Sequence, residues 1–204
     1  MEENWIKTRI YPLPNRPSED EYRECLQQLP AWRKQQAEAF RFLSDKLQCA
    51  KAYILLQSLL TEDLKLPAQL RFSYGPYGKP FLADYPHLHF NLSHCARAVM
   101  CVVSNTEVGC DVEEIPSQLE QELLDLCFSA EEQRLIRQSN TPMVEFTRLW
   151  TSKEALLKLH GTGLTDDLPS LMTSPLARGA LFTTTICRER GYVYTTCTLR
   201  KQNN

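Results

Sequence analysis

The chain has 204 residues, of which 43% are hydrophobic and 24% charged, and its formal net charge is −2. This is the composition of a globular protein that buries a core, and the near-neutral charge argues against binding nucleic acid through bulk electrostatics. No apolar run approaches the roughly 20 residues that cross a bilayer, and no apolar segment follows the acidic start. We therefore expect a cytoplasmic protein with no nucleic-acid or membrane partner.

The first half of the sequence combines helical and strand patterns. Ser18 and Glu21 have the spacing of a capping box, which predicts a helix that runs to Leu29. Apolar residues recur at helical spacing over 31–60, which predicts one long helix or two helices broken near Ser44. The remaining predictions are a loop at 75–80, rich in glycine and proline, and strands at 71–74, 88–92, 98–104 and 108–112.

The second half repeats the order of helices and then strands. A second capping-box pattern begins at Ser129 and predicts a helix to about Gln138. Thr141-Pro142 predicts the start of a longer helix that stops at Gly161. A final hairpin is predicted from strands 180–187 and 192–199. The class predicted is α+β, with an N-terminal lobe over 1–104 and a C-terminal lobe over 105–204 that pack as one body.

The eight cysteines show no metal-site spacing and form no C-x-x-C pair. Several lie inside apolar runs, as Cys101 does in Val99-Met100-Cys101-Val102-Val103. Without a signal peptide, we expect buried free thiols rather than disulfides.

Two carboxylates are two residues apart near the end of the strand predicted at 108–112: one is inside the strand and the other directly follows it. Side chains two residues apart on a strand share a face, so Asp111 and Glu113 project together. Like charges this close repel unless a cation or proton intervenes, and Mg²⁺ prefers oxygen ligands of this kind. A strand end with both carboxylates in water is the alternative.

A second pair lies on the long helix that precedes Gly161. Glu154 and Lys158 are one helical turn apart and share a face. Alone, they are equally consistent with a surface ion pair, which contributes roughly 0.2–0.5 kcal/mol. Glu154 could also add a third carboxylate to the metal site begun by Asp111 and Glu113.

Two further motifs suggest contacts with phosphate. Ser93-His94 at a strand end offers two donors, and no nucleophile elbow surrounds the serine, which argues against a hydrolase. Lys79 lies on the stiff Gly78-Lys79-Pro80 loop and could anchor a phosphate, although the loop lacks P-loop spacing. The alternatives are a strand terminus and an exposed turn.

Taken in order, these segments resemble the Sfp-type 4′-phosphopantetheinyl transferases. The matching motifs are Tyr77-Gly78-Lys79-Pro80, Phe90-Asn91-Leu92-Ser93-His94, Val108-Gly109-Cys110-Asp111-Val112-Glu113, Phe128-Ser129-x-x-Glu132, Trp150-x-x-Lys153-Glu154-Ala155-x-x-Lys158 and Gly161-x-Gly163-Leu164. Each motif is short, and their shared order and spacing make the resemblance specific. The resemblance implies two similar α/β lobes about a pseudo-twofold axis with coenzyme A between them, and a monomer.

The resemblance also implies roles for individual residues. Magnesium would be held by the three carboxylates Asp111, Glu113 and Glu154. Coenzyme A would be contacted by Lys79, Ser93, His94 and Lys158, with Arg33 or Lys34 as candidates for its 3′-phosphate. The catalytic pair would be Glu154, as the base for the attacking serine, and Lys158, at the leaving-group side of the pyrophosphate.

One departure from the family pattern concerns the 3′-phosphate. The family arginine that grips this group falls at Gln48, so either Lys46 or Lys51 compensates or the grip is weaker. The basic stretch from Arg33 to Lys51 is consistent with a solvated helical face, a coenzyme A contact or a surface for an acidic carrier protein.

The activity implied is transfer of 4′-phosphopantetheine from coenzyme A to a serine of an apo acyl or peptidyl carrier protein, with release of adenosine 3′,5′-bisphosphate. Two alternatives use the same residues. A magnesium-dependent phosphohydrolase would use water as the nucleophile, and a non-catalytic scaffold would keep the cleft without transfer.

Overall fold

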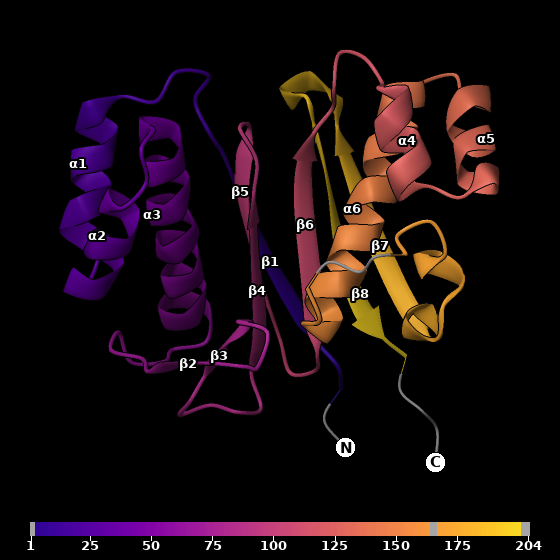
Figure 1. Cartoon of the computed structure of the whole chain (residues 1–204). Coiled ribbons are helices and arrows are strands. Elements are labelled where there is room, and N and C mark those ends of the chain that lie inside the picture. The colour runs from indigo at the N-terminus through magenta and orange to yellow at the C-terminus, as the bar shows by residue number, and fades with distance from the viewer. Residues whose placement is uncertain (1–2, 164–166, 201–204) are drawn as a thin grey trace.

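Two groups of helices enclose two layers of strands in the computed structural model, which describes residues 3–163 and 167–200 (Figure 1). The elements of the first half are β1 Ile6–Pro12, α1 Glu19–Gln28, α2 Ala31–Glu38, α3 Leu43–Ser58, a π-helical turn Leu59–Asp63, β2 Phe72–Tyr74, β3 Pro80–Leu82, β4 His89–His94 and β5 Ala98–Ser104. Those of the second half are β6 Val108–Glu114, α4 Gln121–Cys127, α5 Ala130–Gln138, α6 Pro142–His160, β7 Ala180–Cys187 and β8 Tyr192–Leu199.

Most of the predicted elements are confirmed. Ser18 caps α1 by accepting the Glu21 amide, and Ser129 and Glu132 form a complete capping box on α5. The basic segment is two helices, because the chain leaves the helix over 39–42. Gly161 ends α6 in the left-handed conformation, with φ of 66°. The predictions missed β1, β3 and α4.

The strands form two three-stranded antiparallel sheets and one small two-stranded ribbon. The first sheet has the order β1-β5-β4, the second has the order β6-β8-β7, and β2 pairs with β3. Helix α3 packs against the first sheet and α6 against the second, so the sheets face each other in the middle of the molecule (Figure 1). The α+β class is confirmed, and the division at residues 104 and 105 stays a prediction.

Strand β5 is buried along its whole length because both of its faces are covered. Cys101 and Val103 point toward the end of α3, where they join a cluster with Leu56 and Leu59. The alternate residues face the second sheet and pack with the apolar residues of β6, including Val108, Cys110 and Val112. This arrangement turns the other face of β6 toward α6. All eight cysteines are free thiols, as predicted.

Side chains of β4 complete the open edge of β6. The Cys110 amide donates to Asn91 Oδ1 at 3.1 Å, and the Val112 amide donates to Ser93 Oγ at 3.3 Å. Buried amides need a partner, and here polar side chains supply it in place of another strand. The contact fixes the Ser93 end of β4 against the Asp111 region of β6.

Helix α6 lies directly on the backbone of β6 at Gly109. A Cβ atom at this position would come within 2.0 Å of the Ala155 carbonyl oxygen and 2.4 Å of the Leu159 amide nitrogen. Both are backbone atoms, so the clash cannot be relieved by a side-chain rotation. Glycine at 109 therefore sets the distance between the strand that carries Asp111 and the helix that carries Glu154.

Gly109→Ala should lower the free energy of unfolding by about 1–3 kcal/mol or more, because the helix must shift to admit the methyl group. Urea denaturation measures the change. Gly75→Ala is the matched control, since its Cβ would meet only the Lys79 carbonyl oxygen at an ordinary 3.6 Å. Equal stability of the two variants would contradict the close packing of α6 on Gly109.

The described residues include no helix that is long and apolar enough to cross a membrane.

Candidate functional site

Asp111, Ser93 and Lys158 form a polar cluster where β4, β6 and α6 meet. Asp111 Oδ1 accepts hydrogen bonds from Lys158 Nζ at 2.6 Å and from Ser93 Oγ at 2.7 Å. Lys158 also donates to Ser93 Oγ at 3.0 Å. The Asp111 side chain is only 2% exposed, whereas that of Lys158 is 30% exposed and reaches the surface of the site. Three residues predicted from separate motifs are therefore in direct contact.

The second oxygen of Asp111 is not satisfied by this cluster. Asp111 Oδ2 is buried and has no hydrogen-bond partner among the residues described. A buried carboxylate oxygen normally has a donor or a cation beside it, because desolvation without a partner costs free energy. A donor or a cation beside Asp111 Oδ2 would therefore stabilise this carboxylate.

The two other candidate carboxylates, Glu113 and Glu154, have pKa values that are raised mainly by burial. Burial first, and then the Asp111 carboxylate, raise the pKa of Glu113 to about 7. Burial is also the main cause of the raised pKa of Glu154, with Lys158 opposing it and Asp111 adding to it. One lysine does not balance three carboxylates, so a further cation would stabilise their ionised forms.

A cavity of about 330 Å³ borders this cluster. Its walls include Glu154, Leu157 and Lys158 of α6, Asn91 and Leu92 of β4, and the loop from Tyr77 to Pro80. Glu154 and Lys158 face it together because they are one helical turn apart. The cavity brings the loop motif predicted at 77–80 to the α6 motif, nearly 80 positions later in the chain.

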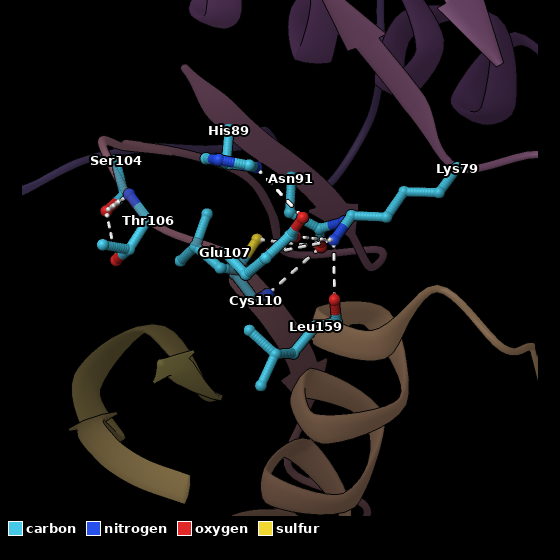
Figure 2. A network of polar contacts seen from close by, with 9 residues as sticks. Lys79, His89, Asn91, Ser104, Thr106, Glu107, Cys110 and Leu159 are labelled. Carbon is cyan, nitrogen blue, oxygen red and sulfur yellow. Dashed lines mark hydrogen bonds and ion pairs between the residues drawn. The ribbon is translucent and has the colours of Figure 1, made fainter. Parts of the chain in front are cut away.

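Lys79 points at the end of α6, toward the Leu159 carbonyl (Figure 2). Its ammonium group donates to the Leu159 carbonyl at 2.7 Å and pairs with Glu107 at 3.1 Å. Glu107 in turn lies 3.1 Å from His89 Nδ1. A cation at a helix C-terminus satisfies a free carbonyl and complements the helix dipole. In this conformation Lys79 ties the loop to α6 and β6, and its stem contributes to the cavity wall.

The other residues predicted to contact coenzyme A lie on the side of the molecule formed by α2 and α3. His94 ends β4 with part of its ring exposed, and its pKa is lowered first by loss of solvation and then by Lys158. Arg33 donates to the Cys49 carbonyl at 2.9 Å and has no contact with the Asp111 cluster. Lys34 and Gln48 are half-buried. Lys51 pairs with Glu21 at 3.1 Å, and the compensation for Gln48 by Lys46 or Lys51 stays a prediction.

Comparisons with known proteins show the family of this chain. Residues 107–202 match the family model described as the 4′-phosphopantetheinyl transferase superfamily. Residues 15–106 match the model described as 4′-phosphopantetheinyl transferase, N-terminal. A relative from Bacillus pumilus, 4′-phosphopantetheinyl transferase psf-1, is 33% identical over 170 residues, which span 79% of this chain and 72% of the relative. The chain belongs to the 4′-phosphopantetheinyl transferase superfamily.

Other members of the superfamily are similar over comparable lengths. The 4′-phosphopantetheinyl transferase Sfp of Bacillus subtilis strain 168 is 28% identical over 167 residues, 79% of this chain and 74% of its own length. The 4′-phosphopantetheinyl transferase HetI of a Nostoc species is 29% identical over 166 residues, 78% of this chain and 70% of its own length. The resemblance drawn from the motifs is confirmed.

The predicted magnesium ligands of this transferase, Asp111, Glu113 and Glu154, can be compared with their positions in the structure. Among residues 3–163 and 167–200, no group of three or more His, Cys, Asp or Glu side chains converges closely enough to hold a metal ion. The chemistry nevertheless fits a hard divalent cation, because Asp111 Oδ2 is buried without a partner and Glu113 and Glu154 have raised pKa values. Binding would require the carboxylates to turn toward a common point.

No role was predicted for Lys153 of this transferase, and its side chain is fully buried. Lys153 Nζ pairs with Glu132 at 2.9 Å and donates to the Leu168 carbonyl at 2.6 Å. Glu132 was interpreted only as a capping residue. The sequence signal for this ion pair was a lysine on the inward side of α6, since a buried lysine needs a carboxylate partner. Leu164, the last residue of the final motif, lies outside the described residues.

The raised pKa of Glu113 makes the stability of the metal-free transferase depend on pH. The folded state binds a proton with a pKa of about 7 against an ordinary 4.5, so it holds more protons than the unfolded state between these values. Stability should therefore fall as pH rises through this window, by at most about 3 kcal/mol. Glu113→Gln should remove this part of the pH dependence. Thermal denaturation of both proteins at pH 5 and pH 8 checks it, and identical pH slopes would refute it.

Proposed function

We propose that this protein transfers 4′-phosphopantetheine from coenzyme A to a serine of an apo acyl or peptidyl carrier protein, with Mg²⁺ as cofactor and adenosine 3′,5′-bisphosphate as the second product. The observation that carries the proposal is the Ser93–Asp111–Lys158 cluster at the edge of the 330 Å³ cavity, with one Asp111 oxygen lacking a partner. Membership of the superfamily supports the reaction and the coenzyme A substrate.

Asp111, Glu113 and Glu154 are the residues that would hold the magnesium ion. All three belong to the face between β6 and α6, where burial is the main cause of the raised pKa values of Glu113 and Glu154 and the Asp111 carboxylate adds to it. When bound, Mg²⁺ supplies positive charge against the pyrophosphate oxygens as negative charge develops on them.

Coenzyme A would lie along the cavity and the α2–α3 side. Ser93 and His94 would contact its phosphates and adenosine end together with the loop that carries Lys79. Arg33 or Lys34 would meet the 3′-phosphate. The role of these residues would be to position coenzyme A, because phosphoryl transfer depends mainly on positioning and charge stabilisation.

The transfer step would use two residues of α6. The carrier serine oxygen attacks the β-phosphorus of coenzyme A, and the bond from that phosphorus to the oxygen of the adenosine 3′,5′-bisphosphate breaks. Glu154 would accept the serine proton, because burial raises its pKa and makes it a stronger base than an exposed glutamate. Lys158 would stabilise the charge on the leaving group, since its partly exposed ammonium group faces the cavity.

Intact-mass spectrometry of an apo carrier protein tests the reaction. Incubation with this protein, coenzyme A and Mg²⁺ should add one phosphopantetheine group, and EDTA should prevent the addition. Release of phosphopantetheine from coenzyme A without a carrier would favour a phosphohydrolase. Coenzyme A binding with no transfer to several carriers would favour a scaffold.

The same proposal includes a cytoplasmic monomer of two similar lobes, 1–104 and 105–204. Two sheets that pack against each other within one chain support it, since the cleft then needs no second subunit. Sedimentation at micromolar concentration would contradict the monomer if it gave the mass of a dimer.

A further inference from the structure

A second polar cavity, here called the arginine cleft, lies at the end of the sheets where β6 terminates. It has a volume of about 380 Å³, and its lining includes Arg97, Arg188, Glu189 and Arg190. The β4–β5 turn supplies the first of these residues, and the β7–β8 turn supplies the other three. None of these residues takes part in the proposed transfer step.

The arginines of the cleft differ in how they are engaged. Arg97 is fixed by Glu114 at 2.8 Å and by the Asn15 side chain at 2.8 Å. Arg188 and Arg190 are exposed, and neither guanidinium is paired with a carboxylate of the described residues. Glu189 is the one acidic residue in the lining. Two guanidinium groups are therefore available to an external anion, on a turn of a hairpin rather than on a long flexible tail.

The register of the strands places this cleft next to the reaction site. Glu113 pairs with Val193 and Glu114 with Tyr192, and the Ile115 amide then donates to the Gly191 carbonyl at 2.9 Å. Arg190 directly precedes Gly191, so the turn that carries it lies beside the end of β6 that carries Glu113 and Glu114. A macromolecule that presents a serine to Glu113 and Glu154 would also reach this turn.

We propose that the arginine cleft docks the acidic surface that flanks the modified serine of the carrier protein. The inference rests on the proposed function, because it names the surface that holds its macromolecular substrate. An acidic surface beside that serine would be complementary in charge to the exposed guanidinium groups of Arg188 and Arg190. The basic helices are the alternative surface, and there Lys51 is already paired with Glu21 at 3.1 Å.

The test is the double charge reversal Arg188→Glu/Arg190→Glu in the full-length protein. The KM for the carrier should rise about ten-fold or more at low salt, whereas kcat and the KM for coenzyme A should change less than about two-fold. The difference in carrier KM between this variant and wild type should become smaller at 0.5 M NaCl, where the screening length is about 4 Å. Binding of a carrier whose serine is replaced by alanine should weaken by the same factor, which measures docking without any transfer.

The matched control is Arg178→Glu/Arg200→Glu. These two arginines are exposed at the opposite end of the β7–β8 hairpin, and the change in net charge is the same. An equal rise in carrier KM for both double variants would overturn the proposal in favour of a general charge effect. An unchanged KM for Arg188→Glu/Arg190→Glu would overturn it as well. Failure of the wild-type protein to transfer phosphopantetheine, with carrier binding still sensitive to Arg188 and Arg190, would reject the proposed function and leave the docking surface standing.

Discussion

Lys158→Met is expected to slow phosphopantetheine transfer by about 10²–10³-fold, because it removes a preorganised positive charge beside the proposed leaving group. Lys158 is held in place by Asp111 Oδ1 at 2.6 Å and Ser93 Oγ at 3.0 Å, so little reorganisation is needed before it acts. Steady-state kinetics with a carrier and saturating coenzyme A measure the loss. A rate within a factor of three of wild type would remove Lys158 from the proposed mechanism.

The same variant separates the catalytic role of Lys158 from its role in balancing charge. Without Lys158, the buried Asp111 carboxylate loses its counter-ion in the metal-free protein, which should lower the melting temperature. Mg²⁺ should then stabilise Lys158→Met more than it stabilises wild type, because the Asp111 oxygens are free to bind it. Lys158→Arg is the control that keeps the charge. An equal Mg²⁺-dependent shift in all three proteins would contradict a metal site at Asp111.

The local elements could be predicted from the sequence because their signals are local. Ser18 and Ser129 cap their helices, Gly161 terminates α6, and the final hairpin has the predicted strands. Two of the three missed elements carry weaker signals, since β3 is only three residues long and α4 has no side-chain cap. Such elements are defined by what they pack against rather than by their own pattern.

The candidate site was predictable as a set of residues but not as a network. Spacing placed Asp111 and Glu113 on one face of β6 and Glu154 and Lys158 on one face of α6, the Ser93-His94 motif indicated phosphate donors, and the family resemblance joined them in one site. Spacing could not show that Lys158 binds Asp111 directly, since the two are 47 positions apart. It also could not show that Lys79 turns to the end of α6, because that depends on the three-dimensional position of Leu159.

Lys153→Met is expected to have the largest effect on stability, lowering the free energy of unfolding by about 3–5 kcal/mol. The Lys153 side chain is 0% exposed, and its ammonium group is the partner of Glu132 in the interior between α5 and α6. Glu132 Oε1 already lacks a hydrogen-bond partner among the described residues, so losing Lys153 would leave a buried charge without compensation. The Leu168 carbonyl would lose its donor as well.

The double variant Lys153→Met/Glu132→Gln distinguishes loss of the ion pair from loss of packing. It removes both charges while methionine keeps most of the side-chain volume, and glutamine can still accept the Ser129 amide of the capping box. The double variant should therefore be more stable than Lys153→Met alone, since neutral partners avoid the cost of a buried unpaired charge. Urea denaturation of the wild type, both single variants and the double variant gives the coupling energy. If the two single-variant losses simply add, Lys153 and Glu132 do not act as a pair, and α5 is held to α6 by apolar packing around Phe128 and Ile136 alone.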